Sequence, residues 1–130
     1  MSELELIKTL HLVAAATWTG GLIVLGFVVT AIRSVTDDRA VLQTTARRFS
    51  VVSWVAMAVT LATGVRLYSM YGARPQEFTL KWTLITAAIV IAGIHQLTAR
   101  RTPPAIRGVV QLVILVLSIG IFAAAVMLPF

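Results

Sequence analysis

The stretch KTLHLVAAATWTGGLIVLGFVVTAIR, residues 8–33, decides the fold of this chain. Between its two terminal cations lie 24 uncharged residues, from Thr9 to Ile32. At about 1.5 Å per residue, an α-helix of that length crosses the roughly 30 Å of hydrocarbon in a bilayer. The stretch therefore predicts a membrane-spanning helix.

Two side chains in this stretch, His11 and Trp18, indicate more than a membrane anchor. They are seven residues apart, which is two helical turns, so they lie on one face of the helix. Because an ionisable side chain inside a membrane helix is costly, a functional role for His11 is the default. The alternative for His11 is a hydrogen bond to another helix, and for Trp18 it is ordinary packing. The helix is therefore predicted to present His11 as a ligand.

The composition of the whole chain is that of a membrane protein. Of the 130 residues, 58% are hydrophobic and 12% are charged, whereas a soluble domain has about 25% charged residues. The net charge is +6, but the cations flank apolar runs, so we expect them to orient the chain in the lipid bilayer and expect no nucleic-acid partner. Cysteine is absent, which excludes disulfides and thiolate metal sites.

Charged residues and prolines divide the chain into four apolar segments. We expect helices at about 5–33, 47–71, 79–100 and 106–128, with residues 34–46 leading into the second helix and breaks at Gly72, Pro75 and the pair Pro103-Pro104. Short loops make consecutive helices antiparallel neighbours. The predicted fold is therefore an all-α, integral membrane, up-down four-helix bundle that forms a single domain over residues 1–130.

The distribution of cations predicts the orientation in the membrane. The first and third loops hold seven of them, Arg33, Arg39, Arg47, Arg48, Arg100, Arg101 and Arg107. The opposite side holds four, Lys8, Arg66, Arg74 and Lys81. Because the more basic loops stay in the cytoplasm, we expect a multi-pass protein of the cytoplasmic (inner) membrane. Loops one and three would be cytoplasmic and both termini would lie outside.

Position along each helix sorts the polar residues by depth. An outer group is expected to contain His11, Arg66, Met70, Lys81 and Met127, and an inner group Ser53, His95 and Gln111. Lys81 and His95 lie on one helix about 21 Å apart. Because His11 is expected at the level of Lys81, His11 and His95 are not expected to share one ligand. Alternatives stay open: Lys81 can extend to the membrane surface, and His95 can bond to Gln111. Gly20, Gly21 and Gly64 are expected to permit close helix contact.

Several motifs occur in an order that resembles the copper-resistance D family. They are LHLVAAATWTGGL (10–22), ARRFS (46–50), Thr63-Gly64, Tyr71-Gly72 and LKW (80–82). The resemblance covers about residues 6–101 and implies a membrane protein that handles copper ions or moves them across the cytoplasmic membrane. It implies a soft Cu(I) site of His11 with Met70 or Met127, and a periplasmic copper carrier as partner.

The chain also resembles the related four-helix membrane protoporphyrinogen oxidase family, whose members bind heme b. The shared residues are His11, Trp18, Lys81 and His95. This resemblance implies His11 as an axial ligand, Trp18 as a wall of the pocket, and Arg66 and Lys81 as partners of the propionates, with a neutral Lys81 as the alternative second ligand.

We rank copper first because its motif match is broader, although the charges of Arg66 and Lys81 favour an anionic ligand such as heme. Enzymatic activity, a heme-dependent membrane oxidoreductase with a redox partner, is expected only in the heme case. A third alternative is an accessory subunit of a larger membrane complex. The oligomeric state stays open.

Overall fold

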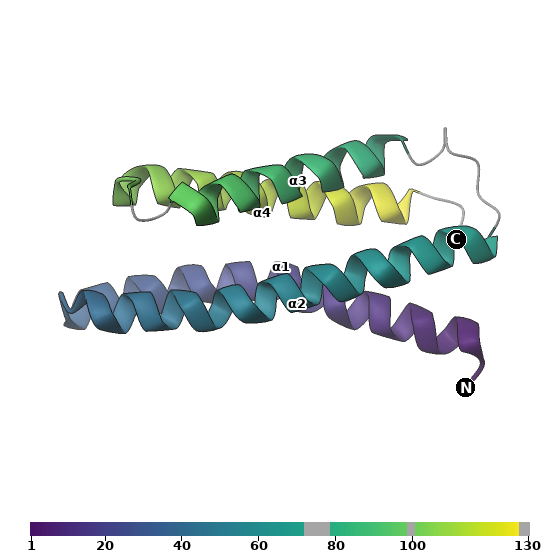
Figure 1. Ribbon diagram of the computed structural model, residues 1–130, viewed down its shortest axis with the longest axis horizontal. Helices are drawn as coiled ribbons and strands as arrows, with labels where there is room; N and C mark the ends of the chain where they lie inside the picture. Colours follow the sequence, from purple (N-terminus) through teal and green to yellow (C-terminus); the bar gives the residue numbers. More distant parts are fainter. Residues whose placement is uncertain (72–78, 99–100, 128–130) are drawn as a thin grey trace. The chain divides into compact units, whose positions relative to one another are not determined.

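The computed structural model describes residues 1–71, 79–98 and 101–127, and nearly all of them are helical. There are four helices in these ranges: α1 (Glu3–Val35), α2 (Arg39–Tyr71), α3 (Thr79–Thr98) and α4 (Pro104–Val126) (Figure 1). No strand occurs within the described ranges. The all-α, four-helix fold class is confirmed.

All four helices are long and apolar enough to cross a membrane by length and composition. This confirms the chain as a membrane protein at that level. Uncharged apolar side chains dominate the exposed surface of the helices, with Phe27, Leu12 and Val116 each more than half exposed. In water such a surface would be a liability, whereas in lipid it is the expected outer face of a spanning helix.

The helix starts differ from the predicted ones at three places, the first being α1, which begins at Glu3 instead of residue 5. α2 begins at Arg39 instead of residue 47, because Asp38 accepts a hydrogen bond from the backbone N–H of Ala40 at 2.9 Å and so caps the new helix. α4 begins at Pro104, since proline is favoured at the first helical position. The predicted ends at residues 100 and 128, and the breaks at Gly72 and Pro75, lie outside the described residues.

The start of α1 is fixed by a capping box. Oγ of Ser2 accepts the backbone N–H of Glu5 at 3.2 Å, and Oε2 of Glu5 accepts the backbone N–H of Ser2 at 2.8 Å. Two backbone donors that no helical carbonyl could satisfy are thereby paired. Glu3 and Glu5 in the first turn and Arg33 in the last turn also match the helix dipole.

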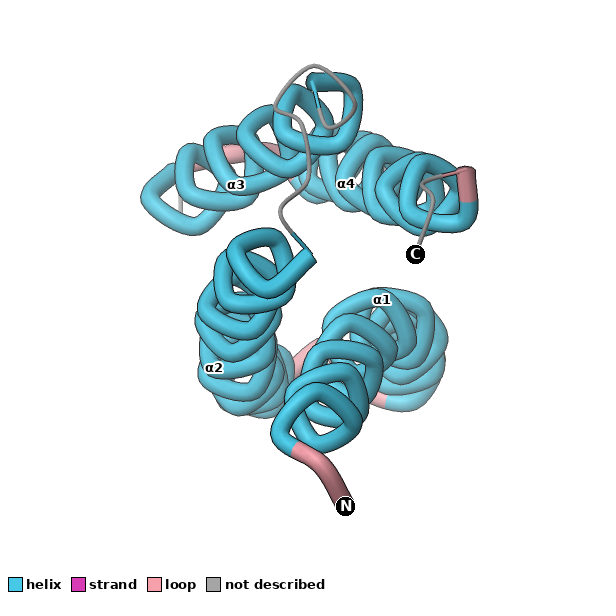
Figure 2. The backbone as a smooth tube through the Cα atoms, turned by 90° about the vertical axis from the view of Figure 1, so that its right-hand side faces the viewer, coloured by secondary structure: helices cyan, strands magenta, loops and turns pink. Residues whose placement is uncertain are grey.

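The helices form two compact units, each an antiparallel hairpin (Figures 1 and 2). The first hairpin, within Met1–Gly72, consists of α1 and α2. Its buried residues are Ala14 and Trp18 on α1 and Ala56, Met57 and Leu67 on α2. Trp18 contacts Trp54 edge to face, with ring centroids 6.4 Å apart at an interplanar angle of 66°. Such a pair contributes about 0.5–1.5 kcal/mol beyond its buried area.

The second hairpin, within Ala73–Phe130, consists of α3 and α4. Its buried residues are Ala88 and Ala92 on α3 and Ile114, Ser118 and Ala124 on α4. The Ser118 hydroxyl donates to the Ile114 carbonyl at 2.9 Å, so burial leaves its proton satisfied. Small residues on both helices let the backbones approach closely, as is usual between membrane helices. A single domain over residues 1–130 stays a prediction.

Candidate functional site

His11 is the residue of α1 that makes the most specific contact with α2. Its Nδ1 lies 3.0 Å from the carbonyl oxygen of Thr60 and 3.0 Å from Oγ1 of Thr63. The imidazole is half-buried. The predicted alternative of an interhelical hydrogen bond is therefore confirmed, and it involves Nδ1.

The partners of Nδ1 determine the tautomer of the ring. A carbonyl oxygen only accepts hydrogen bonds, so Nδ1 must carry the proton. The hydroxyl of Thr63 donates its own proton to the Val59 carbonyl at 2.7 Å, which leaves its oxygen able to accept from His11. The neutral imidazole then carries its lone pair on Nε2. Histidines that bind metals almost always have this arrangement, in which the second nitrogen donates to a carbonyl, carboxylate or water.

Gly64 makes room for the imidazole. A Cβ at this position would lie 3.2 Å from Cε1 and 3.6 Å from Nδ1 of His11, so a larger residue would push the ring away. The predicted close contact is confirmed for Gly64 and wrong for Gly20 and Gly21. Among the described residues, a Cβ on either of those two would meet no atom within 4 Å.

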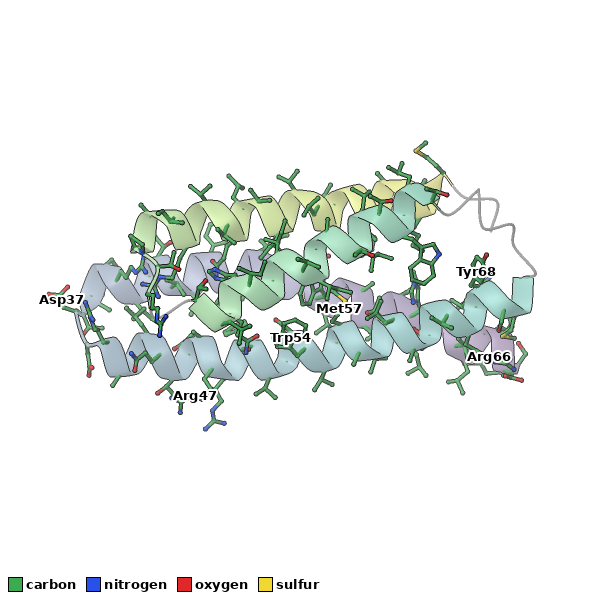
Figure 3. The ribbon with its side chains drawn as sticks, turned by 45° about the horizontal axis from the view of Figure 1, so that its top comes forward. Asp37, Arg47, Trp54, Met57, Arg66 and Tyr68 are labelled. Carbon is green, nitrogen blue, oxygen red and sulfur yellow. The ribbon has the colours of Figure 1, made fainter. Side chains whose placement is uncertain are left out.

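Arg66 forms an ion pair with Glu3 at one end of the first hairpin. Nη2 of Arg66 lies 2.6 Å and Nε 3.2 Å from Oε1 of Glu3. Figure 3 shows Arg66 at the end of the hairpin opposite Asp37. Glu3 is eight residues from His11, roughly 12 Å along the helix. The Arg66 charge is thus balanced by a carboxylate that lies two turns from the imidazole.

The methionines proposed as copper ligands belong to different hairpins. Met70 follows Gly64 by six residues, about 9 Å along α2. Met127 follows α4 in the second hairpin and is 78% exposed. The buried Met57 precedes Gly64 by seven residues. Counted from Thr60, whose carbonyl contacts His11, Met57 lies about one helical turn away along α2.

Trp18 belongs to the core of the first hairpin. It is 6% exposed, and its ring contacts Trp54, two helical turns from His11 along α1. The packing alternative is confirmed for this residue. Its part in a heme pocket stays a prediction.

The other two predicted site residues, Lys81 and His95, lie on α3 in the second hairpin, and both are half-buried. They are fourteen residues apart, about 21 Å along one helix, so no single small ligand reaches both. The predicted bond between His95 and Gln111 does not occur in the described part of the chain.

Sequence reasoning missed Thr60, Thr63 and Glu3 as partners. A usable signal was present, since Thr60, Thr63 and Gly64 recur at spacings of three and four and so share one face of α2. In the described residues, no cluster of three or more histidine, cysteine or acidic side chains could hold a metal ion. In comparisons with known proteins, no family model, curated protein or solved structure matches the chain.

Proposed function

We propose that this chain is a heme b-binding membrane protein in which His11 supplies an axial ligand. The observation that carries the proposal is the hydrogen bond from Nδ1 of His11 to the Thr60 carbonyl. It selects the tautomer whose Nε2 lone pair can bind iron. Bound heme would supply one-electron redox chemistry within the membrane.

The donor set around His11 suits heme better than a bare metal ion. A porphyrin brings four nitrogens of its own, so the protein has to add only axial ligands. A Cu(I) ion takes its ligands from the protein, with a preference for thiolate or thioether sulfur. The groups of α2 that Nδ1 of His11 contacts are oxygens, the Thr60 carbonyl and the Thr63 hydroxyl, and neither supplies sulfur. One oriented imidazole is therefore sufficient to bind a heme and insufficient to hold a bare Cu(I) ion.

The neighbouring residues have positioning roles in this proposal. Thr60 and Thr63 hold the imidazole through Nδ1, and Gly64 leaves space for the ring. Arg66 would have to exchange its Glu3 partner before it could pair with a heme propionate. Lys81 and His95 lie about 21 Å apart on α3, so at most one of them contacts the heme that His11 binds.

Copper handling of the copper-resistance D type is the second proposal, and one observation favours it. The ion pair with Glu3 neutralises Arg66, which removes one of the two positive charges that opposed a cation near His11. In this case His11 would bind copper together with Met70 or Met127, and a periplasmic copper carrier would be the partner.

The orientation in the inner membrane is also a proposal, and exposed arginines support it. Arg33, Arg39, Arg47 and Arg48 are all exposed near the turn between α1 and α2. Such clusters favour the cytoplasmic side. Glu3 and Arg66 would then lie at the outer surface.

The test is an absorption spectrum of the purified protein, oxidised and reduced, after expression with added heme. His11→Asn is the decisive variant, because an asparagine amide can replace Nδ1–H as donor to Thr60 while it lacks an equivalent of Nε2. We expect a Soret band in the wild type and its loss in His11→Asn at unchanged helicity. A wild type without a Soret band would refute heme binding. Copper measured by mass spectrometry in the same two samples tests the second proposal.

A further inference from the structure

The first hairpin has a groove on its surface that does not involve His11. Its volume is about 380 Å³, within the roughly 300–1,000 Å³ of known ligand pockets. Its floor on α1 contains Ala16, Gly20 and Gly21, and its wall on α2 contains Arg48, Phe49 and Val52. All of these residues lie within two helices of membrane-spanning length.

The two glycines of the floor face open space. A Cβ added to Gly20 or Gly21 would meet no atom within 4 Å among the described residues. The glycines therefore do not serve the contact between α1 and α2, which Gly64 serves at the level of His11. What they create instead is a shallow apolar channel, which runs from Ala16 to Val24 over about 12 Å of α1.

One end of the channel is positively charged. Arg48 lines the groove and is exposed, and Arg47 beside it is exposed outside the groove; Figure 3 shows Arg47 projecting away from the hairpin. Arg48 immediately precedes the apolar run of α2 that begins at Phe49. An arginine at that position lies where the hydrocarbon meets the phospholipid headgroups.

Charge and apolarity together select the occupant. An apolar channel suits an acyl chain, and a guanidinium at its end suits a phosphate, which it binds with two parallel hydrogen bonds. A second copy of this chain suits the groove less well. Two copies share one orientation in the membrane, so a symmetric contact would place both Arg48 side chains at the same level, and like charges repel.

We propose that this groove binds one anionic phospholipid, with an acyl chain along Ala16–Val24 and the phosphate on Arg48. The leaflet is the one next to the turn between α1 and α2. This inference is independent of heme or copper binding, because the groove and the His11 contacts have no residue in common.

The probe is phosphatidylglycerol, compared with phosphatidylcholine of the same acyl chains, added to the delipidated full chain in detergent. Native mass spectrometry then counts the bound lipids. We expect one phosphatidylglycerol to bind about tenfold more tightly than phosphatidylcholine, because both lipids offer the phosphate to Arg48 but choline adds a cation that the guanidinium repels. Equal affinity of the two lipids would overturn the proposal.

Two variants with matched controls locate the lipid. Arg48→Gln should remove the preference for phosphatidylglycerol, whereas Arg47→Gln, which removes the same charge outside the groove, should retain it. Gly21→Leu should fill the channel and weaken the binding of both lipids, whereas Gly26→Leu on the same helix should leave their binding unchanged. A Cβ at Gly26, as at Gly21, meets no atom within 4 Å among the described residues, and circular dichroism verifies that both leucine variants fold.

Three results would overturn the proposal. An equal loss of the preference for phosphatidylglycerol in Arg47→Gln and Arg48→Gln would indicate a general attraction of the anionic lipid to a basic surface. Unchanged lipid binding in Gly21→Leu would exclude the groove as the binding site of the lipid. A dimer that dissociates in Gly21→Leu without any lipid preference in the wild type would assign the groove to a second copy of the chain.

Discussion

Nδ1 of His11 lies 3.0 Å from the carbonyl oxygen of Thr60, so a side chain of α1 is held by the backbone of α2. A backbone carbonyl cannot be removed by substitution of its side chain, and it accepts only N–H or O–H donors. The tautomer of His11 is therefore built into the helix pair. The proposed heme ligation through Nε2 depends on this relationship.

Gly64→Ala should displace the imidazole. The new methyl group would stand 3.2 Å from Cε1 of His11, so the ring has to give way by a few tenths of an ångström. We expect a loss of stability of about 1 kcal/mol and lower heme retention, measured by thermal unfolding in detergent and by the Soret absorbance. The control is Gly26→Ala, which meets no atom within 4 Å and should stabilise α1 slightly through helix propensity. Equal behaviour of the two variants would contradict a spatial role for Gly64.

Thr63→Val should weaken the hydrogen bonding of His11 Nδ1 to α2 without abolishing it. The substitution removes an acceptor 3.0 Å from Nδ1 at nearly constant shape, while the Thr60 carbonyl remains. The expected cost is about 0.5–1.5 kcal/mol, with a small change in the heme midpoint potential, because less electron density is shared with the ring. Thr63→Ser keeps the hydroxyl and should behave as the wild type. A potential that shifts equally in both variants would argue against this hydrogen bond.

The ion pair between Glu3 and Arg66 should matter little for stability. Both side chains are more than half exposed, at 63% and 54%, and such pairs contribute roughly 0–1 kcal/mol. We expect Glu3→Gln to change the free energy of unfolding by less than about 1 kcal/mol. Added salt should reduce this difference. If His11 binds copper, the same variant should also weaken copper binding, since the charge of Arg66 is then unbalanced. A heme spectrum should not respond to Glu3→Gln.

Lys81→Met and His95→Met should not both alter a heme spectrum. Their side chains start about 21 Å apart along α3, which exceeds the reach of one macrocycle. We expect at most one of the two variants to shift the absorbance bands. Equal shifts in both would contradict the straight course of α3 between Thr79 and Thr98.

The four helices could be predicted because charges interrupt otherwise apolar runs. The exact start of α2 could not, since residues 39–46 mix polar and apolar side chains and extend the helix beyond the uninterrupted apolar run. Asp38, which caps that extension, resembles any other loop aspartate in sequence.

The contacts of the site were harder to predict than the helices. His11 was identified because an ionisable side chain in a membrane helix is unusual. Its partners Thr60 and Thr63, and the Glu3 partner of Arg66, depend on the register between two helices, which a single sequence does not contain. The same holds for the glycines: which of Gly20, Gly21 and Gly64 faces another helix depends on the rotation of each helix about its axis.

The most direct measurement is the reduced-minus-oxidised absorption spectrum of the wild type beside His11→Asn. Both proteins should be purified in the same detergent after expression with added heme. Axial ligation through Nε2 predicts a heme b spectrum in the wild type and none in the variant at equal helical content. A variant that keeps the wild-type spectrum would contradict the role assigned to His11.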